Sequence, residues 1–92
     1  MTFSDLAFSA NRPARRQTRA VAAFPNGYGA SVIHDNNRSD RYEVAVLRNG
    51  KICYDTPITD NVRVNLTRAD VTRILGEIAA LPTIGVQAHD ER

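Results

Sequence analysis

The sequence predicts an α+β domain in which an antiparallel sheet of about four strands packs against one C-terminal helix. Between residues 18 and 55, short apolar runs rich in β-branched residues alternate with turn residues. Asn49-Gly50 separates two of these runs, and after residue 67 apolar residues recur at helical spacing. The 92 residues allow one small domain. We expect this domain to span 18–82, between a flexible basic leader (1–17) and a flexible tail (83–92).

The leader is polar apart from two isolated phenylalanines, and Pro13 interrupts any helix there. Phe3 and Phe8 are expected to attach it to the body, because exposed aromatic rings in a tail are otherwise hard to explain. Residues 1–20 carry four arginines and one aspartate, a net charge of +3. The basic character of the chain therefore belongs to the leader.

Three apolar runs predict the first strands: TRAVAAF, YGASVIHD and RYEVAVLR. Pro25-Asn26-Gly27 predicts the turn between the first two, and a polar stretch at 36–40 separates the second from the third. Asn49-Gly50 predicts a type I′ hairpin into KICYD, since both central residues of that turn need positive φ. A two-residue turn pairs Leu47 with Ile52 and Val46 with Cys53. Both faces of this hairpin are apolar, so the helix can pack on either one.

The helix is expected to begin after Thr67, which makes a capping box with Asp70. A short strand at VRVNL can precede it. The helix ends before Pro82. Its apolar stripe consists of Val71, Ile74, Leu75, Ile78 and Leu81.

Composition excludes several classes of protein. With 42% apolar and 24% charged residues, the chain is close to an average globular protein, and its net charge of +2 is too small to indicate a nucleic-acid binder. The single cysteine excludes an internal disulfide and, with two histidines, an ordinary structural zinc site. No apolar run is long enough for a membrane span, and no secretion signal is evident, so a cytoplasmic protein is expected. Eleven of the twelve basic residues are arginine. This bias suits contacts with carboxylates or phosphates, which a guanidinium binds with two hydrogen bonds, and it also follows from the codon usage of a GC-rich genome.

Residues capable of catalysis are sparse. Cys53 and His34 offer a thiol and an imidazole, but a cysteine between apolar strand residues is usually buried and inert. His89 lies in the tail. Asp55 and Asp60 flank Thr-Pro-Ile-Thr and offer a cation site or acid–base pair, although such residues more often stabilise loop backbone. Gly27-Tyr28-Gly29 lacks the rest of a dinucleotide fingerprint. We expect no enzyme, no cofactor and no metal site.

Two surfaces are better candidates for binding. The arginines of the leader can follow phosphates, but no stacking aromatic residues lie between them, so only weak nucleic-acid contact is expected. The outer face of the helix, called the helix back, bears small side chains and few charges. Such a face suits close packing against a second copy or another partner, and it is also what an ordinary alanine-rich helix presents. The leader arginines are Arg12, Arg15, Arg16 and Arg19, and the helix back is Ala69, Thr72, Gly76 and Ala80.

Four segments resemble a family of small proteins of temperate phages and prophages: FPNGYGASVI, YEVAVL, ICYDTPITD and DVTRIL. They cover roughly residues 24–81. The family has a glycine-rich segment between its second and third strands, whereas this chain has the shorter, more charged stretch 36–40. The resemblance implies an accessory protein expressed inside a bacterial host, and small phage proteins such as anti-CRISPR proteins commonly occupy a surface of a host complex.

Three hypotheses follow. The leading one is a non-enzymatic protein that binds a host protein complex, such as a CRISPR-Cas defence complex, and inhibits it. The others are a weak nucleic-acid-binding accessory protein acting through the leader, and an enzyme using Cys53 or the loop acids. The expected partner-binding residues are Tyr28, Asp55, Asp60, Arg63, Arg73 and Gly76, chosen because tyrosine and arginine dominate binding hot spots or because they lie in the DTPITD loop or on the helix back.

Overall fold

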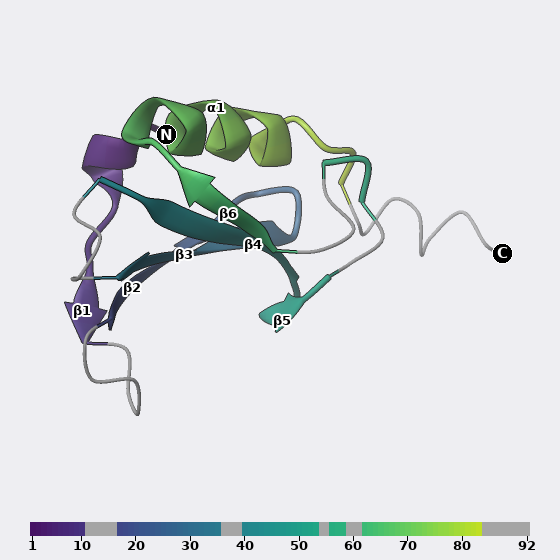
Figure 1. Cartoon of the computed structure of the whole chain (residues 1–92). Coiled ribbons are helices and arrows are strands. Elements are labelled where there is room, and N and C mark those ends of the chain that lie inside the picture. The colour runs from purple at the N-terminus through teal and green to yellow at the C-terminus, as the bar shows by residue number, and fades with distance from the viewer. Residues whose placement is uncertain (11–16, 36–39, 54–55, 59–61, 84–92) are drawn as a thin grey trace, which may run out of the picture.

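The computed structural model describes residues 1–10, 17–35, 40–53, 56–58 and 62–83. Its elements are η1 (Phe3–Asp5), β1 (Ser9–Ala10), β2 (Gln17–Ala23), β3 (Tyr28–Asp35), β4 (Tyr42–Arg48), β5 (Lys51–Ile52), β6 (Arg63–Leu66) and α1 (Arg68–Ala79). The strands form one antiparallel sheet in the order β1-β2-β3-β4-β5, and β6 pairs with β4. Helix α1 lies across one face of this sheet (Figure 1). The expected α+β fold with a single helix is confirmed.

The predicted hairpin is present with the predicted register. Asn49 and Gly50 have φ angles of 53° and 84°, as a type I′ turn requires. Arg48 pairs with Lys51 and Leu47 with Ile52, and the Cys53 N–H donates to the Val46 carbonyl at 2.8 Å. The ladder of β5 ends at Ile52, so this strand is shorter than the sequence predicts.

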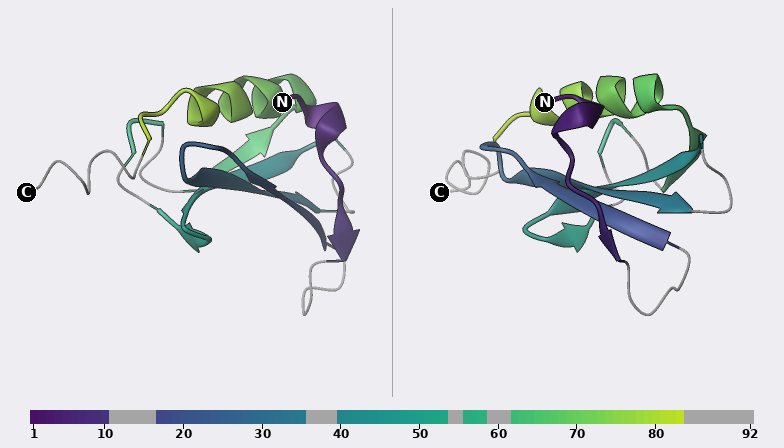
Figure 2. Two further views of the ribbon diagram at one scale, coloured as in Figure 1. Left: turned by 180° about the vertical axis from the view of Figure 1, so that it is seen from behind. Right: turned by 90° about the vertical axis from the view of Figure 1, so that its left-hand side faces the viewer.

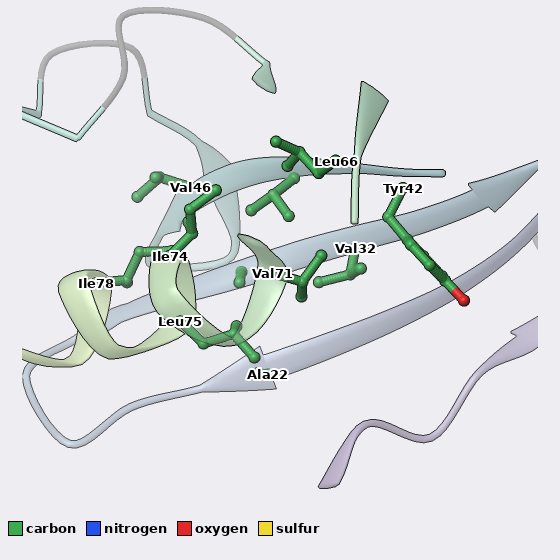
Figure 3. Packing of buried hydrophobic residues seen from close by; sticks show 11 residues of the cluster. Ala22, Val32, Tyr42, Val46, Leu66, Val71, Ile74, Leu75 and Ile78 are labelled. Atoms are coloured by element: carbon green, nitrogen blue, oxygen red, sulfur yellow. The ribbon is translucent and has the colours of Figure 1, made fainter. Parts of the chain in front are cut away.

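Helix α1 covers the sheet face that carries Val44 and Val46. The sequence pattern did not decide between the two apolar faces of the hairpin. Side chains of α1 interlock there with alternate residues of three strands and with Leu66 of β6 (Figure 3). Val32, Val44 and Val46 are at most 1% exposed, and the four apolar helix residues are fully buried. Those helix residues are Val71, Ile74, Leu75 and Ile78.

The first ten residues pack against the domain that the sequence predicts for residues 18–82. The Phe3 ring lies edge-on to Tyr42 at 4.8 Å between centroids, and Phe8 lies 6.1 Å from the same ring. β1 adds a strand to the edge of β2, and η1 sits beside the start of α1 (Figure 2). Phe3 and Phe8 therefore attach this segment to the body, because burying their rings removes apolar surface from water. Residues 11–16 and 84–92 lie outside the described residues.

A buried asparagine joins the β2–β3 turn to the far end of the helix. The Asn26 side-chain amide donates to the carbonyls of Ile78, Ala79 and Leu81 at 2.9, 3.3 and 3.0 Å, and its oxygen accepts from the Tyr28 N–H at 3.0 Å. The last carbonyls of a helix have no partner within it. Asn26 supplies donors to them from a residue more than fifty positions earlier in the chain.

Replacing Asn26 should destabilise the fold by an amount that depends on the charge introduced. Asn26→Ala removes three side-chain hydrogen bonds to carbonyls at the helix end, one of them buried, and should cost about 1–3 kcal/mol in free energy of unfolding. Asn26→Asp should cost more at neutral pH, since a carboxylate repels the negative end of the helix dipole, and the difference should shrink in acid. Urea denaturation measures both. Asn49→Gly, in a turn that accepts glycine, is the control and should change stability by less than about 1 kcal/mol; equal costs at both asparagines would contradict the role of Asn26.

Two glycines form a matched pair for testing backbone packing. A Cβ on Gly29 would collide with the carbonyl oxygen of Ala22, whereas a Cβ on Gly76 meets no atom within 4 Å. We therefore expect Gly29→Ala to destabilise by roughly 1–3 kcal/mol. Gly76→Ala should stabilise by up to about 1 kcal/mol through helix propensity. Thermal unfolding of the two variants should shift the midpoint in opposite directions; a loss at position 76 as large as at position 29 would be inconsistent with this packing.

Candidate functional site

The structure does not bring Tyr28 and Arg63 together as anchors of one surface. Tyr28 begins β3 opposite Arg48, while Arg63 begins β6 opposite Val44. These two partners are four positions apart on β4, a separation of about 14 Å. The Tyr28 side chain also packs against the core cluster, which limits what it presents to a partner. Asp55 and Asp60 lie outside the described residues.

The helix back is only partly open. Ala69, Gly76 and Ala80 are exposed, but the Thr72 hydroxyl accepts a hydrogen bond from the Phe3 N–H at 2.9 Å and is half-buried. The N-terminal segment thus occupies the middle of the predicted surface. The parts that stay exposed are Ala69 at the start of the helix and the last turn and a half, around Gly76.

Arg73 lies on the exposed side of α1 within a row of charges. Its guanidinium is 3.4 Å from an Asp70 oxygen and 3.3 Å from a Glu77 oxygen, and all three side chains are substantially exposed. Exposed pairs of this kind add little stability. Arg73 therefore stays accessible, although an acidic group of a partner would have to compete with the carboxylates of Asp70 and Glu77 for its guanidinium.

Arg19 does not belong to the leader. It lies within β2, where its Nε donates to the Ser31 hydroxyl at 2.8 Å, and the side chain is half-buried. Regular pairing of β2 with β3 places it there, because Arg19 stands opposite Ile33. Arg12, Arg15 and Arg16 lie outside the described residues, so the arginine cluster remains a prediction for those three.

Cys53 and His34 are held apart by the sheet. The Cys53 N–H donates a hydrogen bond to the Val46 carbonyl, whereas His34 lies opposite Tyr42, four positions from Val46 along β4. Cys53 follows the end of β5 and is half-buried, which differs from the buried mid-strand position that the sequence suggests. His34 stacks on the Tyr42 ring at 4.9 Å instead of standing in solvent. The thiol–imidazole pairing is therefore wrong for this fold.

Strand β6 provides an exposed edge with a strongly exposed apolar residue. We call Arg63, Val64 and Asn65 the β6 edge. Val64 is 58% exposed, and the Arg63 guanidinium donates to the Ile58 carbonyl at 3.3 Å. Within the described ranges, β6 pairs with a strand on one side only. An edge strand offers main-chain groups to another chain, and Arg63 and Val64 add a charge and an apolar side chain to it.

A β-bulge sets the orientation of this edge. Asn65 has a φ angle of 61°, and the pairing of β4 with β6 shifts register between Tyr42 and Val44. Val64 consequently lines a small hollow of about 60 Å³ together with residues in and beside β3 and β4. The sequence pattern VRVNL indicates a strand, but alternation cannot reveal the bulge, so the sequence did not identify Val64 as an exposed apolar residue. The other lining residues are Asp35, Arg41, Tyr42, Glu43 and Asn65.

The start of the helix has the predicted capping box. The Asp70 N–H donates to the Thr67 hydroxyl at 3.1 Å, and the Asp70 carboxylate accepts from the Thr67 N–H at 3.0 Å. This backbone hydrogen bond is the main cause of a lowered pKa at Asp70, with smaller contributions from the Thr67 side chain and Arg73. Nearby, Arg68 donates to the Tyr42 hydroxyl at 3.3 Å, which raises the pKa of the guanidinium. The capping box stabilises the first turn of α1, and the Arg68 contact holds this turn against β4.

Comparisons with known proteins identify no relative of this chain. The chain matches no family model, no curated protein and no solved structure. Among the described residues, no three His, Cys, Asp or Glu side chains lie together as metal ligands. Within the same residues, no helix has the length and apolar character needed to cross a membrane.

The capping box predicts how acid affects stability. Because folding lowers the pKa of Asp70, its contribution is complete above the ordinary value of 3.8 and is lost as the pH falls through the lowered value. Asp70→Asn should therefore be less stable than the wild type at pH 6, with a gap that narrows below about pH 4. Urea titrations between pH 6 and pH 2 measure this gap. Glu77→Gln, which keeps both cap hydrogen bonds, should lose less at pH 6; a constant gap for Asp70→Asn at every pH would refute the assignment.

Proposed function

We propose that this chain is a non-enzymatic accessory protein of a temperate phage or prophage, and that it binds a host protein complex in the bacterial cytoplasm and inhibits it. The observation that carries the binding role is the β6 edge. A large apolar side chain that is 58% exposed stands there on a strand that pairs with one other strand, β4, among the described residues, beside an arginine that donates to a backbone carbonyl. Anchors of this kind suit a protein partner, because main-chain pairing supplies affinity and the side chains supply selectivity.

The charges around Val64 support a partner with basic groups at the contact. Asp35 and Glu43 line the same hollow as Val64, and Arg41 adds one positive charge. A partner strand laid along β6 would place its own side chains over this hollow. A defence complex, such as a CRISPR-Cas assembly, remains part of the proposal through the resemblance to phage proteins.

Affinity capture with matched variants tests this proposal. The tagged protein should retain one host protein at stoichiometric level from a nuclease-treated bacterial lysate. Val64→Asp should reduce the retained amount at least tenfold, since a charge replaces the apolar anchor. Val64→Thr, which keeps the shape and strand propensity of the side chain, should show a smaller loss. Circular dichroism confirms that each variant is folded.

Three variants decide between the proposed surface and its alternatives. Gly76→Gln changes the helix back and should leave capture unchanged. The triple variant Arg12→Gln, Arg15→Gln, Arg16→Gln is preferred to deletion of residues 1–17, because deletion would also remove the Phe3 and Phe8 contacts. Capture that survives Val64→Asp but fails with Gly76→Gln would move the site to the helix. Recovery of many nucleic-acid proteins that vanish with nuclease and with the arginine variant would favour the leader.

A further inference from the structure

Two Asn-Gly pairs occur in this chain, Asn26-Gly27 and Asn49-Gly50. Each pair lies in a tight turn between two strands, the first between β2 and β3 and the second between β4 and β5. Asparagine loses its side-chain amide most readily before glycine, because glycine has no side chain to shield its backbone nitrogen. The sequence makes the two pairs equivalent, so a difference in their reactivity has to come from the structure.

The loss of the amide involves the asparagine side chain, the next backbone nitrogen and water. The glycine nitrogen gives its proton to solvent and attacks the side-chain carbon Cγ of the asparagine. The new N–C bond closes a succinimide ring, while the Cγ–Nδ2 bond breaks and the amide takes up a proton and leaves as ammonia. Water then opens the ring at either of its two carbonyl carbons, which gives aspartate or isoaspartate. No oxidant or reductant takes part.

Hydrogen bonds hold every reacting group of the first pair. The Asn26 amide nitrogen, which has to leave, donates to three carbonyls at the end of α1 at 2.9, 3.3 and 3.0 Å. Its oxygen accepts from the Tyr28 N–H, and the attacking nitrogen of Gly27 donates to the Phe24 carbonyl at 3.1 Å. Asn26 is also only 6% exposed. The reaction there requires the turn to separate from the end of α1.

The second pair lacks these restraints among the described residues. Asn49 and Gly50 are both exposed, and neither the Asn49 side chain nor the Gly50 N–H makes a hydrogen bond to a described residue. A Cβ built on Gly50 would meet no atom within 4 Å, so the space beside its nitrogen is open. The Asn49 N–H donates to the Gly27 carbonyl at 3.4 Å, which is long for a hydrogen bond.

The short strand after this turn allows the hairpin to open locally. Ring closure requires rotation about the backbone bonds of Asn49, which the type I′ turn holds at a φ of 53°. Strand β5 consists of two exposed residues, and the Cys53 N–H adds one further hydrogen bond to β4. A ladder of this length at the edge of a sheet opens at a small fraction of the cost of global unfolding. Its opening leaves the core contacts of α1 in place.

We propose that Asn49 is a site of spontaneous deamidation in the folded protein, whereas Asn26 reacts only when the fold opens. The two products at position 49 differ in their effect on the hairpin. Aspartate adds a negative charge and keeps the turn, because Asp-Gly also suits type I′. Isoaspartate adds one carbon to the main chain, so the turn no longer matches the register of Arg48 with Lys51.

Deamidation of the purified wild type, with no partner present, tests the proposal. The protein is incubated in mildly alkaline buffer with and without urea, and peptide mass spectrometry follows the gain of about 1 Da at each asparagine. In the folded protein Asn49 should react at least a hundredfold faster than Asn26, because only Asn26 requires disruption of the core. In denaturing urea the two rates should agree within tenfold, because both pairs are then exposed.

Urea concentrations below the unfolding transition separate local opening from global opening. The rate at Asn26 should rise in proportion to the unfolded fraction, while the rate at Asn49 should change little. Equal rates at the two asparagines in the folded protein would overturn the proposal. A rate at Asn49 that follows the unfolded fraction would overturn it as well.

Two variants at position 49 serve as matched controls. Asn49→Gly removes the reactive amide and should leave the rate at Asn26 unchanged. Asn49→Asp supplies the aspartyl product and should keep the unfolding midpoint of the wild type. Electron-transfer fragmentation identifies the isoaspartyl product, whose Cys53 N–H should exchange with solvent faster than that of Asn49→Asp. Equal exchange in these two forms would contradict the lengthened turn.

Discussion

The hydrogen bonds of Asn26 are the contacts that hold the helix in its place over the sheet. They tie a tight turn between two strands to the end of a helix more than fifty residues later, and they add side-chain donors to the carbonyls of Ile78, Ala79 and Leu81. Apolar packing alone is not directional, so it permits a helix to slide or rotate on a sheet. The amide fixes one end of α1 by geometry.

The other end of the helix is fixed by the first residues of the chain. The Phe3 N–H binds the Thr72 hydroxyl, the Phe3 ring packs on Tyr42, and the Arg68 guanidinium lies 5.5 Å above that same Phe3 ring. With both ends held, α1 can cover only one face. The described chain has a single α-helix, and on the face opposite to it Val21 is 57% and Ile52 48% exposed.

The proposed binding role rests on the β6 edge, which combines main-chain groups with Arg63 and Val64. This edge does not coincide with the helix back, where the N-terminal segment is bound to Thr72. Asp35 and Glu43 line the same hollow as Val64, so the charges beside the edge come from β3 and β4.

Local chemistry by itself determined several elements of this protein. Asn49-Gly50 defined a hairpin because only positive φ suits that turn, and Thr67 with Asp70 marked the helix start because a capping box involves residues three apart. Contacts between distant residues were decided only by the tertiary structure: the helix-covered face, the packing of the Phe3 ring on Tyr42 and the role of Asn26. The Asn65 bulge belongs to the same group, since it redirects Val64 without any change in the apolar pattern. Sequence spacing reports interactions within a turn or a helix, whereas the choice between two apolar faces depends on side chains that meet only after the chain has folded.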